Sequence, residues 1–223
     1  MFSLLTAAIA PALALLTYFY LKADYRRKLH ETIIRTFLLG ILLVFPVMVL
    51  QYAFIEEEIF TKEWQQAIIL YGFTEEFFKW FILLIFAYQH GSIARRNDGI
   101  VYGVSLSLGF ATMENVFYLI AHGIETAVGR ALMPVSSHAL FGIIMGYYLG
   151  SAKLMPTKKR WLLSLSLLLP VALHSSYDYI VFLFDHYVLF GIIPFMLMLW
   201  VFAIYKIRLA SKLDQQSPRT RGN

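Results

Sequence analysis

The sequence predicts an all-α, polytopic membrane protein with about seven to eight transmembrane helices. First, 59% of the residues are hydrophobic and only 15% are charged, whereas soluble domains carry about 25% charged residues. Second, apolar runs long enough to cross a bilayer as helices recur from one end of the chain to the other. Third, basic residues gather in every second loop between these runs, as the positive-inside rule requires of a multi-pass protein.

The apolar runs leave too little polar sequence for a separate soluble domain. We expect spans at 1–21, 36–55, 64–89, 99–121, 131–152, 161–184 and 187–205. The first lacks the basic n-region of a signal peptide, so we interpret it as an uncleaved anchor. The segment 36–63 holds either one span or a span and an interfacial helix. We therefore expect a single transmembrane domain at 1–205 and a disordered basic cytoplasmic tail at 206–223.

The loop charges predict the orientation. Clusters of lysine and arginine lie in 22–35, 90–98 and 153–160 and in the tail, whereas the intervening loops hold only Lys62 and Arg130. The N-terminus is then outside and the C-terminus cytoplasmic. The net charge of +5 is explained by these loops, so we expect the lipid bilayer and no nucleic acid as a partner.

Ionisable residues inside the predicted spans are the most informative feature. One charged side chain at the bilayer centre costs about 3 kcal/mol on insertion scales. The polar residues in question are Glu75, Glu76, Lys79, Glu114, Asn115, His138, His174 and Asp178. With the orientation above and a rise of about 1.5 Å per residue, all of them fall between the middle of the membrane and its outer face. We therefore predict one polar cavity that opens to the outside.

The spacing of these residues adds detail. Glu75 and Lys79 are four apart on one helix face, and so are His174 and Asp178, so Asp178 can orient the imidazole. Adjacent Glu75 and Glu76 point about 100° apart and do not share one role. Each pair alone would serve equally well as a structural ion pair or a buried hydrogen bond. Together, in one layer, they exceed what helix packing requires.

This combination suits the activation of water. A carboxylate beside imidazoles can act as a general base, and a histidine, Asn115 or Lys79 can support the site or an oxyanion. We prefer this mechanism, which requires no cofactor. The same residue types can instead hold Zn²⁺, but no H-E-x-x-H pair is present. The absence of cysteine excludes thiol catalysis. The alternatives are a proton- or metal-coupled transporter that uses the same carboxylates, and a non-catalytic receptor or scaffold.

Four short motifs carry a resemblance to a known family. They are Glu75-Glu76-Phe77-Phe78-Lys79 (E-E-x-x-K), Phe110-Ala111-Thr112-Met113-Glu114-Asn115 (F-x-x-x-E-N), the lone His138, and His174-Ser175-Ser176-Tyr177-Asp178 (H-x-x-x-D). In order and placement they are similar to the PrsW family of bacterial intramembrane proteases, which is related to the CAAX-prenyl endopeptidases. The resemblance covers essentially the whole chain.

The resemblance implies a function and residue roles. It implies a site-1 protease that makes the extracytoplasmic cut in a single-pass, membrane-anchored anti-sigma factor, as part of regulated proteolysis in a stress response. The catalytic residues would be Glu75, Glu76, His138, His174, Glu114 and Asp178, with Glu75 or Glu76 as the base. The CAAX-type second motif has histidine where this chain has Glu114, which keeps a metal mechanism open. Its ligands would be Glu76, Glu114, His138 and His174.

Overall fold

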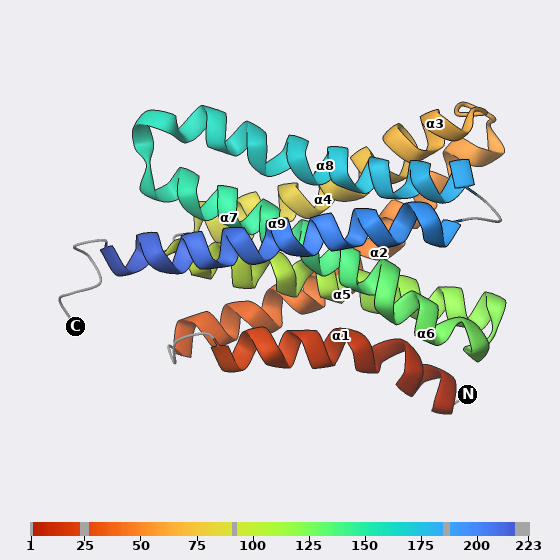
Figure 1. Cartoon of the computed structure of the whole chain (residues 1–223), viewed down its shortest axis with the longest axis horizontal. Coiled ribbons are helices and arrows are strands. Elements are labelled where there is room, and N and C mark those ends of the chain that lie inside the picture. The colour runs from red at the N-terminus through yellow and green to blue at the C-terminus, as the bar shows by residue number, and fades with distance from the viewer. Residues whose placement is uncertain (1, 23–26, 91–92, 185–187, 217–223) are drawn as a thin grey trace.

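The computed structural model describes residues 2–22, 27–90, 93–184 and 188–216, and these form a bundle of antiparallel helices (Figure 1). The long helices are α1 (Phe2–Lys22), α2 (Arg27–Glu56), α5 (Arg96–His122), α7 (Ser136–Leu154), α8 (Lys159–Phe184) and α9 (Val188–Gln216). A further rod consists of α3 (Glu63–Gln65), η1 (Gln66–Phe73), α4 (Thr74–Leu83) and η2 (Leu84–Gln89). Short segments complete the chain: η3 (Ile124–Thr126), α6 (Ala127–Arg130), η4 (Ala131–Val135) and η5 (Pro156–Lys158).

The prediction of an all-α, polytopic membrane protein is confirmed. Six helical segments in the described residues are long and apolar enough to cross a membrane. The seventh predicted span, 64–89, is the rod from Glu63 to Gln89, in which π-helical turns interrupt the α-helix. Helix α2 runs unbroken to Glu56 and is followed by turns, so the segment 36–63 holds one span.

The expected disorder of the tail is corrected by the structure. Helix α9 continues to Gln216, and Asp214 near its end is buried. The Asp214 carboxylate accepts hydrogen bonds from the backbone amides of Arg96 (3.1 Å) and Asn97 (3.0 Å). The first amides of a helix lack partners within it, so Asp214 supplies an acceptor to the start of α5 from a distant helix. Of the predicted tail, residues 217–223 lie outside the described residues.

Helices α5 and α7 form the centre of the bundle, where small residues allow their backbones to touch. A side chain on Gly103 would meet the Gly142 carbonyl oxygen, and one on Gly146 would meet that of Gly99. Close approach through small residues is typical of membrane helices. This contact fixes α5 against α7, and each of these two helices carries residues of the polar cluster described below.

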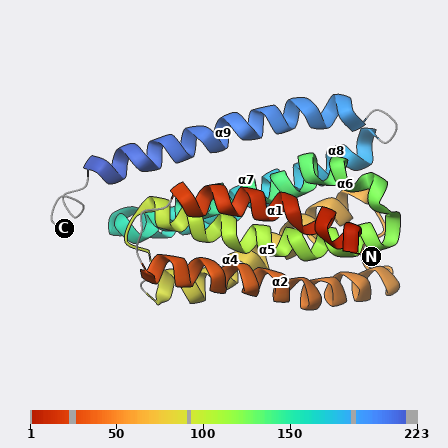
Figure 2. The ribbon, with the colours of Figure 1, turned by 90° about the horizontal axis from the view of Figure 1, so that it is seen from below.

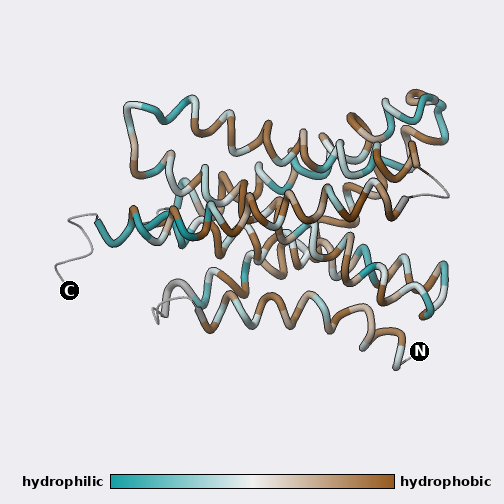
Figure 3. The backbone as a smooth tube through the Cα atoms, viewed as in Figure 1, coloured by the Kyte–Doolittle hydropathy of each residue, from teal (hydrophilic) through white to brown (hydrophobic). Residues whose placement is uncertain are grey.

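The two ends of the bundle differ in charge. Figures 1 and 2 show the N-terminus and the C-terminus at opposite ends, with successive rods running antiparallel. The end near the C-terminus carries the basic loop 153–160, and the end near the N-terminus carries the acidic loop 56–63 and α6. Figure 3 shows apolar residues along the middle of the long helices and polar ones toward both ends. The bundle thus has the apolar belt that a bilayer requires.

Candidate active site

The glutamate pair lies directly after the π-helical segment η1, at the start of α4. A side chain on Gly72 would meet the Ser175 hydroxyl and would lie 2.9 Å from its backbone nitrogen. The missing side chain therefore lets η1 cross α8 closely, next to His174. Segments of π-helix inside α-helices are frequent at functional sites, and this one brings the glutamates against α8.

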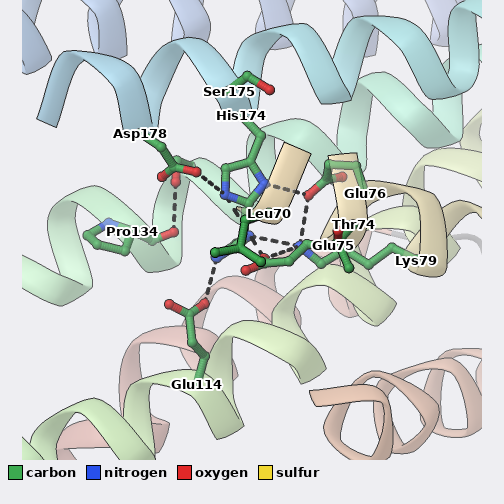
Figure 4. Close-up of polar contacts among 12 residues, drawn as sticks. Leu70, Thr74, Glu75, Glu76, Lys79, Glu114, Pro134, His174, Ser175 and Asp178 are labelled. Carbon is green, nitrogen blue, oxygen red and sulfur yellow. Dashed lines mark hydrogen bonds and ion pairs between the residues drawn. The ribbon is translucent and has the colours of Figure 1, made fainter. Parts of the chain in front are cut away.

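Five buried side chains make direct polar contacts at this crossing (Figure 4). The Lys79 ammonium donates to Glu76 Oε1 at 2.8 Å and to Glu75 Oε2 at 3.3 Å, and lies 3.1 Å from His138 Nδ1. His174 Nδ1 lies 3.0 Å from Glu76 Oε1. Residues from α4, α7 and α8 thus share one cluster, as the common depth of these residues predicted.

The Nε2 atom of each histidine lies close to a carboxylate. His138 Nε2 lies 2.8 Å from Glu114 Oε2, and His174 Nε2 lies 3.4 Å from Asp178 Oδ2. Both rings therefore turn Nε2 toward a carboxylate, while Nδ1 of His174 faces Glu76 and Nδ1 of His138 faces the Lys79 ammonium. Metal-binding histidines commonly have such a carboxylate partner, which fixes the tautomer and the ring orientation. Asp178 Oδ2 lies at ion-pair distance from the ring and has no hydrogen-bond partner among the described residues.

Asn115 lies away from the glutamate pair. It is fully buried, its Nδ2 donates to the Ala8 carbonyl oxygen of α1 (2.9 Å), and its Oδ1 accepts from Arg130 Nε (3.2 Å). The geometry therefore gives Asn115 a place in helix packing and not at an oxyanion. Arg130 NH2 also donates to Glu114 Oε1 at 2.9 Å. Sequence reasoning missed Arg130, although it is one of only two basic residues in the predicted outer loops.

A cavity of about 720 Å³ reaches the cluster from the end of the bundle that carries α6. Its walls include Glu75, Glu114, His138, His174 and Asp178, together with Arg130 and the segment 125–129 at its outer part. Glu76 does not line the cavity and is 0% exposed, whereas Glu75 lines it and is 7% exposed. The two glutamates therefore differ in their access to water. Tyr71, Tyr118 and Tyr177 also line the cavity and were missed, because aromatic residues are common throughout the chain.

The donor set fits a metal ion. One donor atom each from Glu75, Glu76, His138 and His174 lies within 4.8 Å of every other, and zinc takes carboxylate and imidazole ligands. Glu76 Oε2 is buried without a hydrogen-bond partner among the described residues. Glu114, which the sequence analysis expected as a ligand, is not in this group, because its carboxylate contacts His138 Nε2, whereas Glu75 lies close to the other three donors.

The charges of the cluster also favour a divalent cation. Among the described residues, Lys79 contacts Glu75 and Glu76, Arg130 contacts Glu114, and Asp178 contacts His174. With both imidazoles neutral, these four carboxylates are accompanied by two cations. The cluster as a whole then has two uncompensated negative charges. Buried charge is costly unless it is paired or bound to metal, and one divalent cation would offset both charges.

Fold and site together define a membrane-embedded peptidase, and comparison with known proteins identifies its family. The model of the "PrsW family intramembrane metalloprotease" matches residues 29–205. The chain therefore belongs to the PrsW family of intramembrane proteases. No solved structure matches the chain.

Several relatives carry the name "Protease PrsW". That of Halalkalibacterium halodurans is 61% identical over 216 residues, which cover 96% of this chain and 100% of that protein. That of Bacillus subtilis is 46% identical over 96% of this chain and 98% of that protein. That of Clostridioides difficile is 27% identical over 90% and 88%. The predicted enzyme class is confirmed, and the transporter and scaffold alternatives lose their support. The family description as a metalloprotease favours a metal-dependent mechanism over the cofactor-free mechanism that the sequence analysis preferred.

Proposed function

We propose that this protease makes the site-1 cut in a single-pass, membrane-anchored anti-sigma factor, on the extracytoplasmic side of a bacterial cell membrane. The observation that carries the proposal is the cavity that ends on Glu75 and both histidines and opens at one end of the bundle. The anti-sigma factor as substrate rests on the motif resemblance. The relatives' names add only that they are proteases.

The orientation of the bundle supports a cut outside the cell. The cavity opens at the end that carries the N-terminus, the acidic loop 56–63 and α6. The basic loop 153–160 lies at the opposite end, which the positive-inside rule places in the cytoplasm. The N-terminus is then outside and the C-terminus inside, and the cavity faces the outer half of the membrane.

The two glutamates take different roles in this mechanism. Glu76, His138 and His174 would hold Zn²⁺, because Glu76 is sealed from the cavity and the donor atoms of these three residues lie within 4.8 Å of one another. His174 Nδ1 lies next to Glu76 Oε1, and the Lys79 ammonium lies between Glu76 Oε1 and His138 Nδ1. Two histidines and one glutamate form a common catalytic zinc set, which leaves a coordination position for water. When bound, zinc supplies Lewis acidity and lowers the pKa of that water.

Glu75 is the general base. It lines the cavity, and Gln51 Nε2 holds its Oε1 at 3.3 Å from the side of α2. Its carboxylate takes a proton from the attacking water and delivers a proton to the leaving amide nitrogen. The walls of the cavity also include Tyr71, Val181 and Phe182, which suit a locally unwound peptide segment that has apolar side chains.

The test is cleavage of a single-pass anti-sigma factor by the purified protein in lipid nanodiscs. We expect one cut on the extracytoplasmic side of the substrate's membrane segment, loss of cleavage on zinc chelation, and recovery when zinc is added back. Glu57→Gln, in the exposed acidic loop, is the control and should cleave at the wild-type rate. A cut on the cytoplasmic side, or full activity after complete removal of metal, would contradict the proposal.

A further inference from the structure

The side chain of Arg130 links the outer wall of the cavity to His138. Arg130 is the last residue of α6, and its guanidinium is 13% exposed. Its NH2 donates to Glu114 at 2.9 Å, its Nε donates to Asn115 at 3.2 Å, and its Cζ lies over the Tyr118 ring, 4.2 Å from the centroid. Three side chains of α5 thus fix the position of one arginine.

Both carboxylate oxygens of Glu114 are engaged as a result. Oε1 accepts from Arg130 and Oε2 lies 2.8 Å from His138 Nε2. A Glu114 carboxylate held in this way accepts the Nε2 proton of His138. The Nδ1 of the neutral ring then carries a lone pair, because a neutral imidazole carries one proton. This Nδ1 lies 3.1 Å from the Lys79 ammonium, which contacts both glutamates.

We propose that Arg130 is a positioning residue of this protease: it holds Glu114 in the orientation that presents His138 Nδ1 to the metal. The inference rests on the proposed zinc site and deepens it. Arg130 acts through Glu114 and does not itself touch the reacting atoms. Loss of such an outer partner typically weakens metal binding about 10- to 100-fold.

The planar guanidinium is essential to this role. Its fork reaches Glu114 and Asn115 at once while it stacks on Tyr118, and a lysine ammonium offers a point charge without this geometry. Asn115 in turn donates to the Ala8 carbonyl of α1. Arg130 therefore ties α6, at the outer part of the cavity, to α5 and indirectly to α1.

The chain offers a matched control for a purely structural ion pair. Arg96 NH1 lies 3.3 Å from Asp214 Oδ1 near the opposite end of the bundle, and the Arg96 side chain is 11% exposed. Both are largely buried arginine–carboxylate pairs between segments distant in sequence. Arg130 is connected through Glu114 to a histidine of the cluster, whereas Arg96 lies remote from it. If Arg130 contributed only to stability, Arg130→Gln and Arg96→Gln would both lower the melting temperature and leave metal binding unchanged.

The experiment compares Arg130→Gln, Arg130→Lys and Arg96→Gln in the purified full-length protein. The zinc dissociation constant is measured by competition with a chromophoric chelator, and the ligand field by the absorption spectrum of bound Co²⁺. We expect Arg130→Gln to weaken zinc binding 10- to 100-fold and to change the cobalt spectrum. Arg130→Lys should fall between it and the wild type. Arg96→Gln should lower the melting temperature and leave both metal readouts unchanged.

The outcomes separate this inference from the proposed function. If the wild type binds no zinc, the proposed metal site is wrong, and the inference fails with it. If the wild type binds zinc and both Arg130 variants keep its affinity and cobalt spectrum, the inference alone is overturned. The double variant Arg130→Gln/Glu114→Gln should bind zinc no more weakly than Glu114→Gln. Additive losses would contradict action through Glu114.

Discussion

Lys79 is the most unusual residue of the site, because its ammonium is completely buried among groups that suit a metal. It is 0% exposed, contacts Glu75, Glu76 and His138, and lies 4.1 Å from the centroid of the Phe110 ring. In this arrangement it occupies the place of a cation between the donors. Zinc binding by Glu76 and His138 would displace Lys79 Nζ from between them.

This arrangement predicts a metal-dependent loss of stability for Lys79→Met. Removing one partner of a buried ion pair typically costs about 3–5 kcal/mol, because the other charge stays buried and unpaired. We expect a loss of that order in the metal-free protein and a smaller one with zinc bound. Thermal unfolding in detergent with and without chelator measures it, with exposed Lys62→Met as the control. Equal losses in both states would contradict the exchange of Lys79 for a metal.

At the scale of the elements, the crossing of η1 and α8 sets the distance between Glu76 and His174. Gly72 allows it, since a Cβ at this position would lie 2.9 Å from the backbone nitrogen of Ser175. A backbone atom cannot move aside alone, so any side chain must push α8 away as a whole. The distance between Glu76 and His174 thus depends on packing at Gly72, about one helical turn before the E-E-x-x-K motif.

The packing predicts a graded effect of size at Gly72. We expect Gly72→Ala to weaken zinc binding, and Gly72→Leu to abolish both zinc binding and cleavage. A larger side chain at this position pushes α8 further away and so separates His174 from Glu76. Chelator competition measures the affinity. Gly129→Ala is the control, since nothing lies within 4 Å of a Cβ there. Wild-type zinc affinity in Gly72→Leu would show that the crossing does not set the site.

The sequence predicted most elements and the site members, for identifiable reasons. Spans followed from long apolar runs, and the cluster followed from charges at one depth in four spans. The π-helical turns of η1 were not predictable, because periodicity does not distinguish them from α-helix. Arg130 and Asp214 were missed because their partners lie on other helices, and contacts between distant segments leave no local pattern.

At the scale of the whole molecule, the bundle predicts which loops face each side of the membrane. The chain contains no cysteine, so single cysteines can be introduced into an otherwise unreactive protein. We expect Glu57→Cys to react with a membrane-impermeant maleimide added to intact cells, and Lys158→Cys to react only after the cells are opened. Both positions are exposed. The reverse labelling pattern would show the opposite orientation, with the cavity on the cytoplasmic side.

The central claim is the division of labour between the adjacent glutamates, and one paired measurement tests it most directly. Zinc content and substrate cleavage are determined on the same preparations of Glu75→Gln and Glu76→Gln. We expect Glu75→Gln to retain zinc and lose at least about 100-fold in cleavage rate, since it removes the general base. We expect Glu76→Gln to lose zinc and cleavage together. Retained zinc in Glu76→Gln with loss of zinc in Glu75→Gln, or wild-type cleavage by Glu75→Gln, would contradict the account.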